Sequence, residues 1–528
     1  MFLDRRRLLM GAAGLAVPAL GAPSTIYAVP AGVPGSGWVD VRHFGARGDG
    51  VTLDSPAINK AIDYAARRGG GTVYFPAGTY LCFTLRLKSN IVLYLDHGSI
   101  LLAASPPVEG MVSGGYDAAE PIDARYEAFQ DYGHGHWRNS LIWGEGLHDI
   151  AIVGGGLIWG KGLTRDWGDA YGTGGSKKPG IGNKSIALKN CVNVLLRDFK
   201  VLQGGWFCLL ATGVDNLTID NVTVDSNRDG FDIDCCRNVR VSNCTVNTPW
   251  DDGICPKSSF ALGYARATEN VTISNCFLSG SYEMGSVIDG TWKKMPKPFN
   301  GVGRIKCGTE SNGGFRNITI SNCVFEDSRG IALETVDGAN LEDVTIDNIT
   351  MRGAQNAPLF LRLGQRMRGP AGVPVGTLKR VLISNLTSHD ACASPSIIAG
   401  VAGFPVEDVK ISDVYLHQAG GQTQPLDSYA PETKEDQYPE PAGFGDLPAT
   451  GLWVRNARNL ELDNVEVATG AADARPAVWL EKVTGADVVN IKGPKGPLIG
   501  LKDVSGFRSF GSLALPDMRK DGPVSGLF

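Results

Sequence analysis

Apolar and polar residues alternate in a short phrase that returns through most of the 528-residue chain. The clearest copies are NVLLRDF from residue 193, NLTIDNVTV from 216, NVRVSNCTV from 238, NVTISNCFL from 270 and NITISNCVF from 317, with weaker copies from 343, 380, 408 and 459. An alternation of period two indicates strands, and each copy breaks at an Asn or Gly turn before a second short strand. The pattern therefore predicts a strand repeat and not a helical one.

The spacing of the copies predicts how the strands are arranged. The first steps are 23 and 22 residues, followed by 32 and 47 where insertions intervene. A period in the low twenties with two or three strands per turn is typical of a parallel β-helix, and the crossover rule makes it right-handed. The fold class expected is therefore all-β, a right-handed parallel β-helix or solenoid. Cys244, Cys276 and Cys323 recur at one place in the repeat, as Cys191 nearly does, which favours an inward stack over a metal site or disulfides.

One helix is expected, at residues 55–68 near the start of the chain. Ser55 is a suitable N-cap, Pro56 suits the first helical position, and the glycines at 69–71 end the helix. Such a helix can cap the open end of a solenoid.

Glycine is unusually frequent, at 69 of 528 residues, which implies many tight turns. A solenoid adds coils without thickening its core, so residues 38–528 can form a single domain despite their length. The Gly/Pro/acid-rich stretch near 420–452 has no period and is expected to be a long surface loop.

The first 28 residues have the plan of an export signal. Arg5, Arg6 and Arg7 precede an apolar run at 8–20 and small residues at 21–28, which resembles a twin-arginine signal cleaved near Ala22 or Ala28. A short membrane anchor is the alternative, but the run is too short to span a bilayer, and no later segment is long enough. We expect a soluble periplasmic or secreted protein with no membrane partner. The net charge of −5 and the lack of a basic stripe argue against nucleic acid as a partner.

Acidic residues gather on two neighbouring repeats. An ungapped alignment of the coils at 216 and 238 places Asp229 on Asp251, with Asp252 adjacent. Neighbouring coils lie about 4.8 Å apart, and crowding raises the pKa of at least one carboxyl group. A mixture of acid and carboxylate favours paired acid and base chemistry, although a solvated turn or a cation site would also fit. The same counting puts Glu283 in this column, through a weaker register.

The sequence motifs around these residues resemble those of a known family. SNRDGFDID at 226–234 and WDDGICPKS at 250–258 resemble motifs of glycoside hydrolase family 28, the polygalacturonase family, and residues 39–81 resemble the opening of pectin-lyase-like β-helix proteins. The resemblance implies inverting hydrolysis without metal or cofactor, in which Asp251 is the general acid while Asp229 and Asp252 activate water. The substrate-binding set expected with it is Lys257, Arg304, Lys306, Glu310 and Trp250. For Lys257 the alternative is an exposed turn residue.

Two departures from the family pattern stand out. The family's Gly-His-Gly after the Asp pair is missing, and the literal Gly133-His134-Gly135 lies upstream, where we interpret it as a loop coincidence. Arg304-Ile305-Lys306 resembles the family's substrate-binding motif but comes one coil early, because its proper register reads Ala332 and Glu334. We expect Arg304 and Lys306 to bind a uronate carboxylate; the alternative is a structural ion pair with Glu310 or Glu334.

The leading functional hypothesis is hydrolysis of pectic polysaccharide or oligosaccharide. Trp206, Trp250, Tyr282 and Trp292 lie near the acidic edge and suit sugar stacking, although buried aromatic residues are equally common. An insertion at 290–302 is expected to wall one end of the groove and to favour attack at chain ends. The alternatives are a hydrolase of rhamnogalacturonan or another acidic glycan, a lyase, and a non-catalytic glycan-binding β-helix such as an adhesin or tail fibre. The sequence makes no prediction of oligomeric state.

Overall fold

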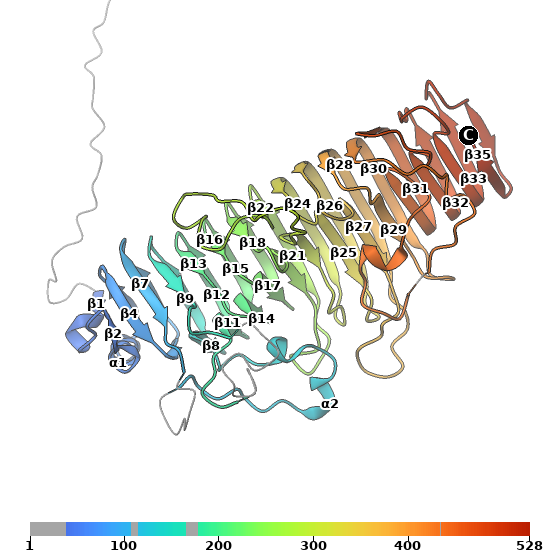
Figure 1. Ribbon diagram of the computed structural model, residues 1–528. Helices are drawn as coiled ribbons and strands as arrows, with labels where there is room; N and C mark the ends of the chain where they lie inside the picture. Colours follow the sequence, from blue (N-terminus) through green and yellow to red (C-terminus); the bar gives the residue numbers. More distant parts are fainter. Residues whose placement is uncertain (1–37, 107–114, 165–177, 433) are drawn as a thin grey trace, which may run out of the picture. The chain divides into compact units, whose positions relative to one another are not determined.

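The computed structural model describes residues 38–106, 115–164, 178–432 and 434–528, and it confirms the parallel β-helix (Figure 1). Residues 39–528 form one compact unit. The expected export signal at 1–28 lies outside the described residues and stays a prediction. No helix in the described part of the chain is both long enough and apolar enough to cross a membrane.

Strands of successive coils stack in three parallel columns. The first column consists of β5 (Leu85–Arg86), β8 (Ile142–Glu145), β11 (Lys184–Lys189), β14 (Phe207–Thr212), β17 (Asp229–Asp234), β20 (Ile254–Lys257), β23 (Ile305–Cys307), β25 (Ile331–Thr335), β27 (Leu359–Leu363), β29 (Ser396–Ala399) and the start of β31 (Leu452–Thr469). The second consists of β1 (Trp38–Asp40), β3 (Gly71–Phe75), β6 (Ile91–Leu95), β9 (His148–Val153), β12 (Val192–Arg197), β15 (Asp215–Asp220), β18 (Arg237–Ser242), β21 (Thr268–Ser274), β24 (Phe315–Glu326), β26 (Leu341–Arg352), β28 (Leu378–Ala391) and β30 (Val406–Gln418). The third consists of β2 (Asp49–Leu53), β4 (Gly78–Cys82), β7 (Ser99–Ala103), β10 (Leu157–Trp159), β13 (Lys200–Leu202), β16 (Thr223–Asp225), β19 (Thr245–Asn247) and β22 (Phe277–Ser279).

The C-terminal end closes differently. Strands β32 (Val478–Val489) and β33 (Ile499–Phe510) continue the parallel stacking, whereas β34 (Met518–Lys520) and β35 (Val524–Leu527) pair with β33 in the antiparallel direction. Two antiparallel strands thus cover part of the last coil, whose unpaired backbone groups would otherwise offer an edge for aggregation.

The repeated Asn of the sequence phrase has a defined structural task. Asn193, Asn216, Asn238, Asn270 and Asn317 all have φ between 56° and 58°, in the left-handed region that Asn tolerates better than most residues. From Asn216 on, each side-chain amide donates to the Asn on the preceding coil, at 2.9, 3.2, 3.1 and 2.7 Å along the series, and Asn193 donates to Asp149 at 2.8 Å. The repeat is therefore visible in the sequence because one residue type both turns the chain and links the coils.

The core confirms the inward stack and the capping helix. Cys244, Cys276 and Cys323 are buried with free thiols, among aliphatic side chains of the neighbouring strands. Helix α1 (Ser55–Arg67) buries Ile58 and Ile62 against the first coils. The predicted N-cap is wrong by one residue, because Ser55 is the first helical residue and Asp54 precedes it.

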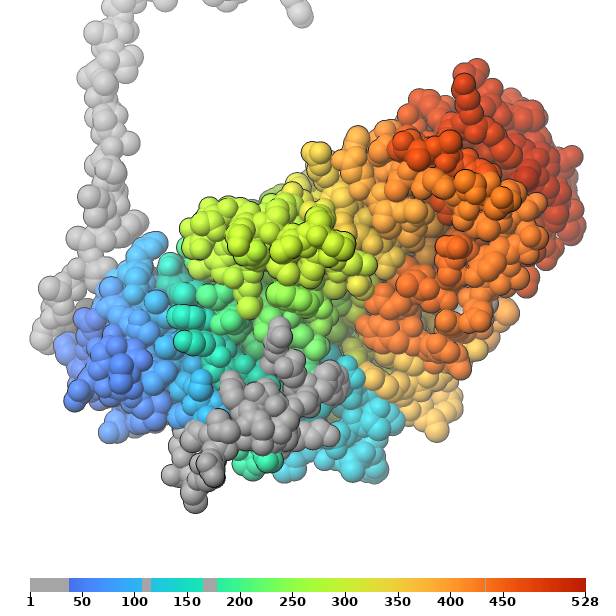
Figure 2. Space-filling view, in the orientation of Figure 1, coloured from blue at the N-terminus to red at the C-terminus, as the bar shows by residue number. Residues whose placement is uncertain are grey.

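In the described part of the chain, three long segments leave the coils between the third column of strands and the first. The first, at 115–140, carries the short helices α2 (Ala124–Glu127) and η2 (Tyr132–Gly135); the second is the insertion at 280–302; the third, at 419–451, contains η4 (Pro441–Phe444). Figure 2 shows them in cyan, yellow-green and orange around the green coils of the middle of the chain. The long irregular loop near 420–452 is thereby confirmed.

Candidate active site

The acidic residues of two coils converge at the start of β17 and β20. One oxygen from each of Asp229, Asp251 and Asp252 lies within 4.8 Å of the other two. The predicted register is wrong by one residue: Phe231 pairs with Ile254, and the Gly230 amide donates to the Asp252 carbonyl at 3.0 Å. Continuing this register places Asp252 beside Asp229, with Asp251 in the turn that precedes it. The turn before β20 has one residue more than the turn before β17, which an ungapped alignment could not show.

Two buried cations hold Asp252. Arg304 Nε binds one carboxylate oxygen and Lys306 Nζ the other, each at 2.5 Å. Burial alone would raise the pKa of Asp252, but Arg304 and Lys306 outweigh burial and hold it well below its usual value. Asp252 is therefore the group that stays ionised.

Asp229 has the opposite tendency. It is buried, and burial together with the charges of Asp251 and Asp232 raises its pKa well above the usual value. A side-chain hydrogen bond to Asp251 favours its protonated form further. Asp229 is therefore the carboxyl group whose protonated form is favoured, next to Asp252, which does not hold a proton.

Asp251 is the accessible member of the three. Its side chain is 27% exposed, against 6% for Asp229 and 2% for Asp252. Arg228 Nε lies 2.8 Å from its Oδ2. Of these three carboxyl groups, Asp251 is thus the most accessible from solvent.

Lys257 lies beneath the carboxylates and not in an exposed turn, which excludes that alternative. Its Nζ lies 3.3 Å from Asp232, 3.6 Å from Glu310 and 3.9 Å from Asp229. Burial would lower its pKa, but the carboxylates of Asp232, Glu310 and Asp229 raise it well above the usual value. Lys257 is a buried cation that compensates this cluster.

The interpretation of Gly133-His134-Gly135 as a coincidence is wrong. The segment at 115–140 folds back over the coils and buries His134, with Nε2 at 3.9 Å from Asp232 and Nδ1 at 4.0 Å from Glu310. Its ring also lies within 4.8 Å of an oxygen of Asp229. Sequence reasoning missed this because register arguments apply to coils and not to a long insertion.

The loop at 419–451 contributes two further residues that the sequence did not single out. Lys306 Nζ donates to the Tyr438 hydroxyl at 3.0 Å, and Glu440 lies 3.4 Å from Arg304 and 3.6 Å from Arg329. The alternative hypothesis paired Arg304 and Lys306 with Glu310 or Glu334. In the structure their ion-pair partners are instead Asp252 and, for Arg304, also Glu440. Contact of Arg304 and Lys306 with a substrate carboxylate stays a prediction.

Glu310 and Glu334 have separate environments. Arg368 Nη2 binds Glu310 at 2.5 Å. Burial would raise the pKa of Glu310, but nearby His134, Lys257 and Arg368 hold it well below its usual value. Burial raises the pKa of Glu334 to about 7, despite nearby Lys306 and Arg304.

The aromatic residues and Glu283, which the sequence places near this edge, differ in exposure and in partners. Trp250 is 41% exposed and meets the ring of Phe299 edge to face, and its contact with substrate stays a prediction. Trp206 is buried beneath the guanidinium group of Arg228. The Tyr282 hydroxyl donates a hydrogen bond to Glu326, and the Tyr282 ring packs edge to face on Trp292. Glu283 pairs with Lys293 within the insertion, at 2.7 Å, and its predicted place in the acidic column is wrong.

The donor set could in principle hold a cation, because three carboxylate oxygens converge. Arg304 and Lys306 already neutralise Asp252, and Lys257 stands beside Asp229. This internal compensation makes the arrangement better suited to proton transfer than to binding a divalent ion.

We expect His134→Ala to lower kcat about tenfold and to move the basic limb of the pH–rate profile upward. Removing the imidazole from among Asp232, Glu310 and Asp229 leaves these carboxylates to repel one another, which raises the pKa of Asp229 further. The measurement is the pH dependence of kcat. His136→Ala is the matched control, because His136 is equally buried in the same segment but stacks on Tyr132. Equal effects of the two variants would contradict this role for His134.

Comparison with known proteins agrees with the resemblance to glycoside hydrolase family 28 seen in the sequence motifs. Residues 119–297 match the model described as glycosyl hydrolases family 28, and residues 38–99 match rhamnogalacturonase A/epimerase, pectate lyase-like. A probable polygalacturonase of Vitis vinifera is 24% identical over 78% of this chain and 83% of that protein.

Two solved structures share the fold, at 18% identity. The exopolygalacturonase of Thermotoga maritima has a TM-score of 0.59, covering 82% of this chain and 92% of that one, and the family 28 exopolygalacturonase of Yersinia enterocolitica has 0.54, covering 92% and 79%. The carboxylates assembled at β17 and β20 lie inside the segment matched by the family model. This protein is thus a glycoside hydrolase whose residues 119–297 match the model of glycosyl hydrolases family 28.

Proposed function

We propose that this protein hydrolyses glycosidic bonds in pectic polysaccharide or oligosaccharide by acid and base catalysis. The observation that carries the proposal is the division of labour among three adjacent carboxyl groups: burial and neighbouring carboxylates favour a proton on Asp229, which is hydrogen-bonded to Asp251, while Asp252 stays ionised. Paired groups whose pKa values are pushed apart are what acid and base catalysis requires. The similarity to a probable polygalacturonase supports the choice of substrate.

In this mechanism Asp251 donates its proton to the glycosidic oxygen as the bond from that oxygen to the anomeric carbon breaks. A water molecule held by Asp252 and Asp229 attacks the anomeric carbon and transfers a proton to the carboxylate. Asp251 is suited to the first task because it is exposed, and Asp252 to the second because it is ionised. Arg304 and Lys306 orient the base by holding both of its oxygens.

On the N-terminal side of the carboxylates, the first column of strands is covered by the segment at 115–140. Phe207 and Lys184 precede Asp229 by one and two coils in the same register, and both are buried. The segment at 115–140 covers this region: Trp137 packs in one cluster with Phe207 and donates to Thr212 at 3.0 Å. This cover supports attack at a chain end. Val302, the last residue of the insertion at 290–302, donates to the Pro249 carbonyl at 3.1 Å, and the role of this insertion as a wall stays a prediction.

We expect single-unit or very short products from homogalacturonan from the earliest times, with inversion at the anomeric carbon. The carboxylates stand closer together than the roughly 6.5–9.5 Å usual for inverting enzymes, so the stereochemistry is a demanding test. Inversion is favoured because both oxygens of Asp252 are already bound to cations, which makes it a poor nucleophile. Chromatography of the products and NMR of the first anomer formed are the measurements.

The outcomes separate the alternatives. Oligosaccharides of mixed length at early times would contradict attack at chain ends, and a retained anomer would contradict the water mechanism. Products that absorb in the ultraviolet would indicate a lyase. Glycan binding without new reducing ends would indicate a non-catalytic module, and cleavage of rhamnogalacturonan alone would indicate the other hydrolase.

A further inference from the structure

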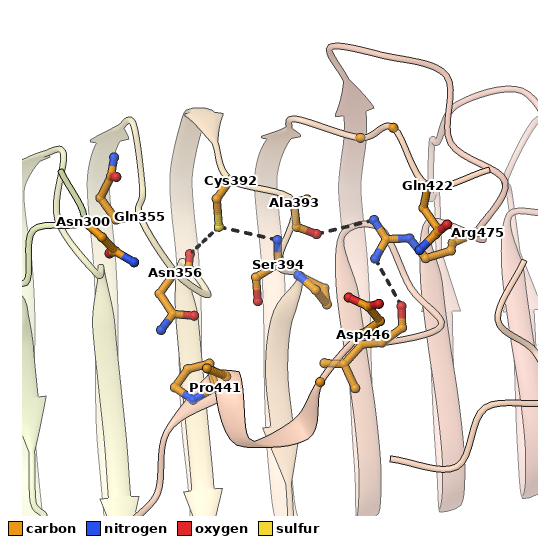
Figure 3. Close-up of a pocket in the computed structure, with 16 residues that line it drawn as sticks. Asn300, Gln355, Asn356, Cys392, Ala393, Ser394, Gln422, Pro441, Asp446 and Arg475 are labelled. Carbon is orange, nitrogen blue, oxygen red and sulfur yellow. Dashed lines mark hydrogen bonds between the residues drawn. The ribbon is translucent and has the colours of Figure 1, made fainter. Parts of the chain in front are cut away.

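A second pocket lies along the β-helix from the catalytic carboxylates, toward the C-terminus (Figure 3). It has a volume of about 590 Å³ and is bounded by the turns that precede β27, β29 and β32 and by the loop that contains η4. Figure 3 shows Asn356, Ser394 and Asp446 around the space above Pro441. None of the carboxylates assigned to catalysis lines it.

The pocket occupies the same position in its coils as the catalytic residues do in theirs. Asp251 and Asp252 lie in the turn before β20, while Asn356 and Ser394 lie in the turns before β27 and β29. Those strands follow β20 by three and four coils, so the distance along the axis is about 14–19 Å at about 4.8 Å per coil. One glycosyl residue of an extended chain spans nearly the length of one coil. A chain cleaved at Asp251 can therefore reach the pocket.

The two places also share a border. Glu440 binds Arg304 and Arg329 at the catalytic site, and the next residue, Pro441, lines the pocket. The loop at 419–451 thus lies along both, and a ligand that leaves the catalytic carboxylates in this direction passes Glu440.

The chemistry of the lining differs from that of the catalytic site. Asn300, Asn356, Ser394 and Gln422 supply amides and a hydroxyl, all at least partly exposed. Arg475 also lines the pocket but is buried, and its guanidinium binds both oxygens of Asp473 and the carbonyls of Leu447 and Ala393. The remaining charged lining residue is the exposed Asp446. The lining thus offers hydrogen bonds to hydroxyl groups and repels carboxylates.

We propose that this pocket binds an uncharged, hydroxyl-rich glycosyl residue of the substrate, about three to four residues from the cleaved bond. The inference rests on the proposed pectic substrate and adds a neutral sugar to the uronic acids recognised at the carboxylates. Amide and hydroxyl side chains at a concave site fix the orientation of such ligands through hydrogen bonds. The pocket would therefore select pectic chains that carry neutral sugars over chains of uronic acid alone.

The test is a titration followed by NMR, with the Asp251→Asn protein and two probes, a neutral galactan tetrasaccharide and a galacturonan tetrasaccharide. We expect the double variant Asn356→Ala/Ser394→Ala to weaken binding of the neutral probe about tenfold and to leave the galacturonan probe unchanged. Gln424→Ala is the matched control, because Gln424 lies on the same loop outside the pocket. If the double variant does not fold, Gln422→Ala takes its place.

The outcomes are distinguishable from those that test the proposed function. Unchanged binding of the neutral probe in the pocket variants, or no binding of it to the parent protein, would overturn the pocket assignment. Failure of the wild-type protein to release reducing ends from any pectic substrate would overturn the proposed function, and the titration would still show whether the pocket binds neutral sugar.

Discussion

The Asp251→Asn protein is expected to lose about three orders of magnitude in kcat while remaining folded. An amide cannot donate the proton that the leaving oxygen needs, and Asp229, which lies beside Asp251, is buried and cannot reach that oxygen. Folding should survive because Asp251 lies in a turn, with its side chain partly exposed. The release of reducing ends and the thermal unfolding temperature are the two measurements.

A matched control removes a similar carboxylate elsewhere. Asp347 lies on β26 in the second column of strands, where it accepts hydrogen bonds from Ser384 and Asn385. Asp347→Asn should leave kcat unchanged, so a large loss there would show that activity depends on overall charge. Near-normal activity of Asp251→Asn would remove Asp251 from its role as the acid.

Lys306→Met is expected to cost about 3 kcal/mol of unfolding free energy and to move the acidic limb of kcat/KM to higher pH. Lys306 binds one oxygen of Asp252, and removing it leaves a buried carboxylate with Arg304 alone. The pKa of Asp252 then rises, so the base becomes protonated at a pH where the wild-type base is still ionised.

The pH dependence of stability follows with a definite sign. In the wild-type protein the folded-state pKa of Asp252 lies below its unfolded value, so its ionisation stabilises the fold at pH values above the unfolded pKa. That contribution is lost as the pH falls through the folded-state pKa, which lies in strongly acidic solution. In Lys306→Met the loss should begin at a higher pH, measurable as the unfolding free energy across acidic pH.

The control for this variant is Lys379→Met. Lys379 makes a partly exposed ion pair with Glu342 at 3.6 Å, of the kind that contributes at most about 1 kcal/mol. It should change neither the pH profile nor the stability by a measurable amount. A Lys306→Met protein with the wild-type acidic limb would contradict the assignment of Asp252 as the base.

The repeat by itself specifies most of the fold. Alternating apolar residues and the recurring Asn specify strands, turns and coil length locally, so the β-helix, the cysteine stack and the long loop near 420–452 could all be predicted. The paired acids were recognisable too, because the sequence motifs that contain them are short and contiguous. The predicted register was wrong across one turn, because a single extra residue near Asp251 places Asp252 next to Asp229.

Tertiary structure alone decided the surroundings of those acids. His134, Tyr438 and Glu440 come from insertions whose paths no repeat constrains, and they reach the site by folding back over coils far away in the sequence. The protonation states depend on burial and on Arg304 and Lys306, which lie more than 50 residues beyond Asp252 in the chain. Sequence alone thus determined the solenoid and the identity of its acids, because both arise from local patterns. Which acid holds the proton was decided only by long-range packing, because charges act through space and not along the chain.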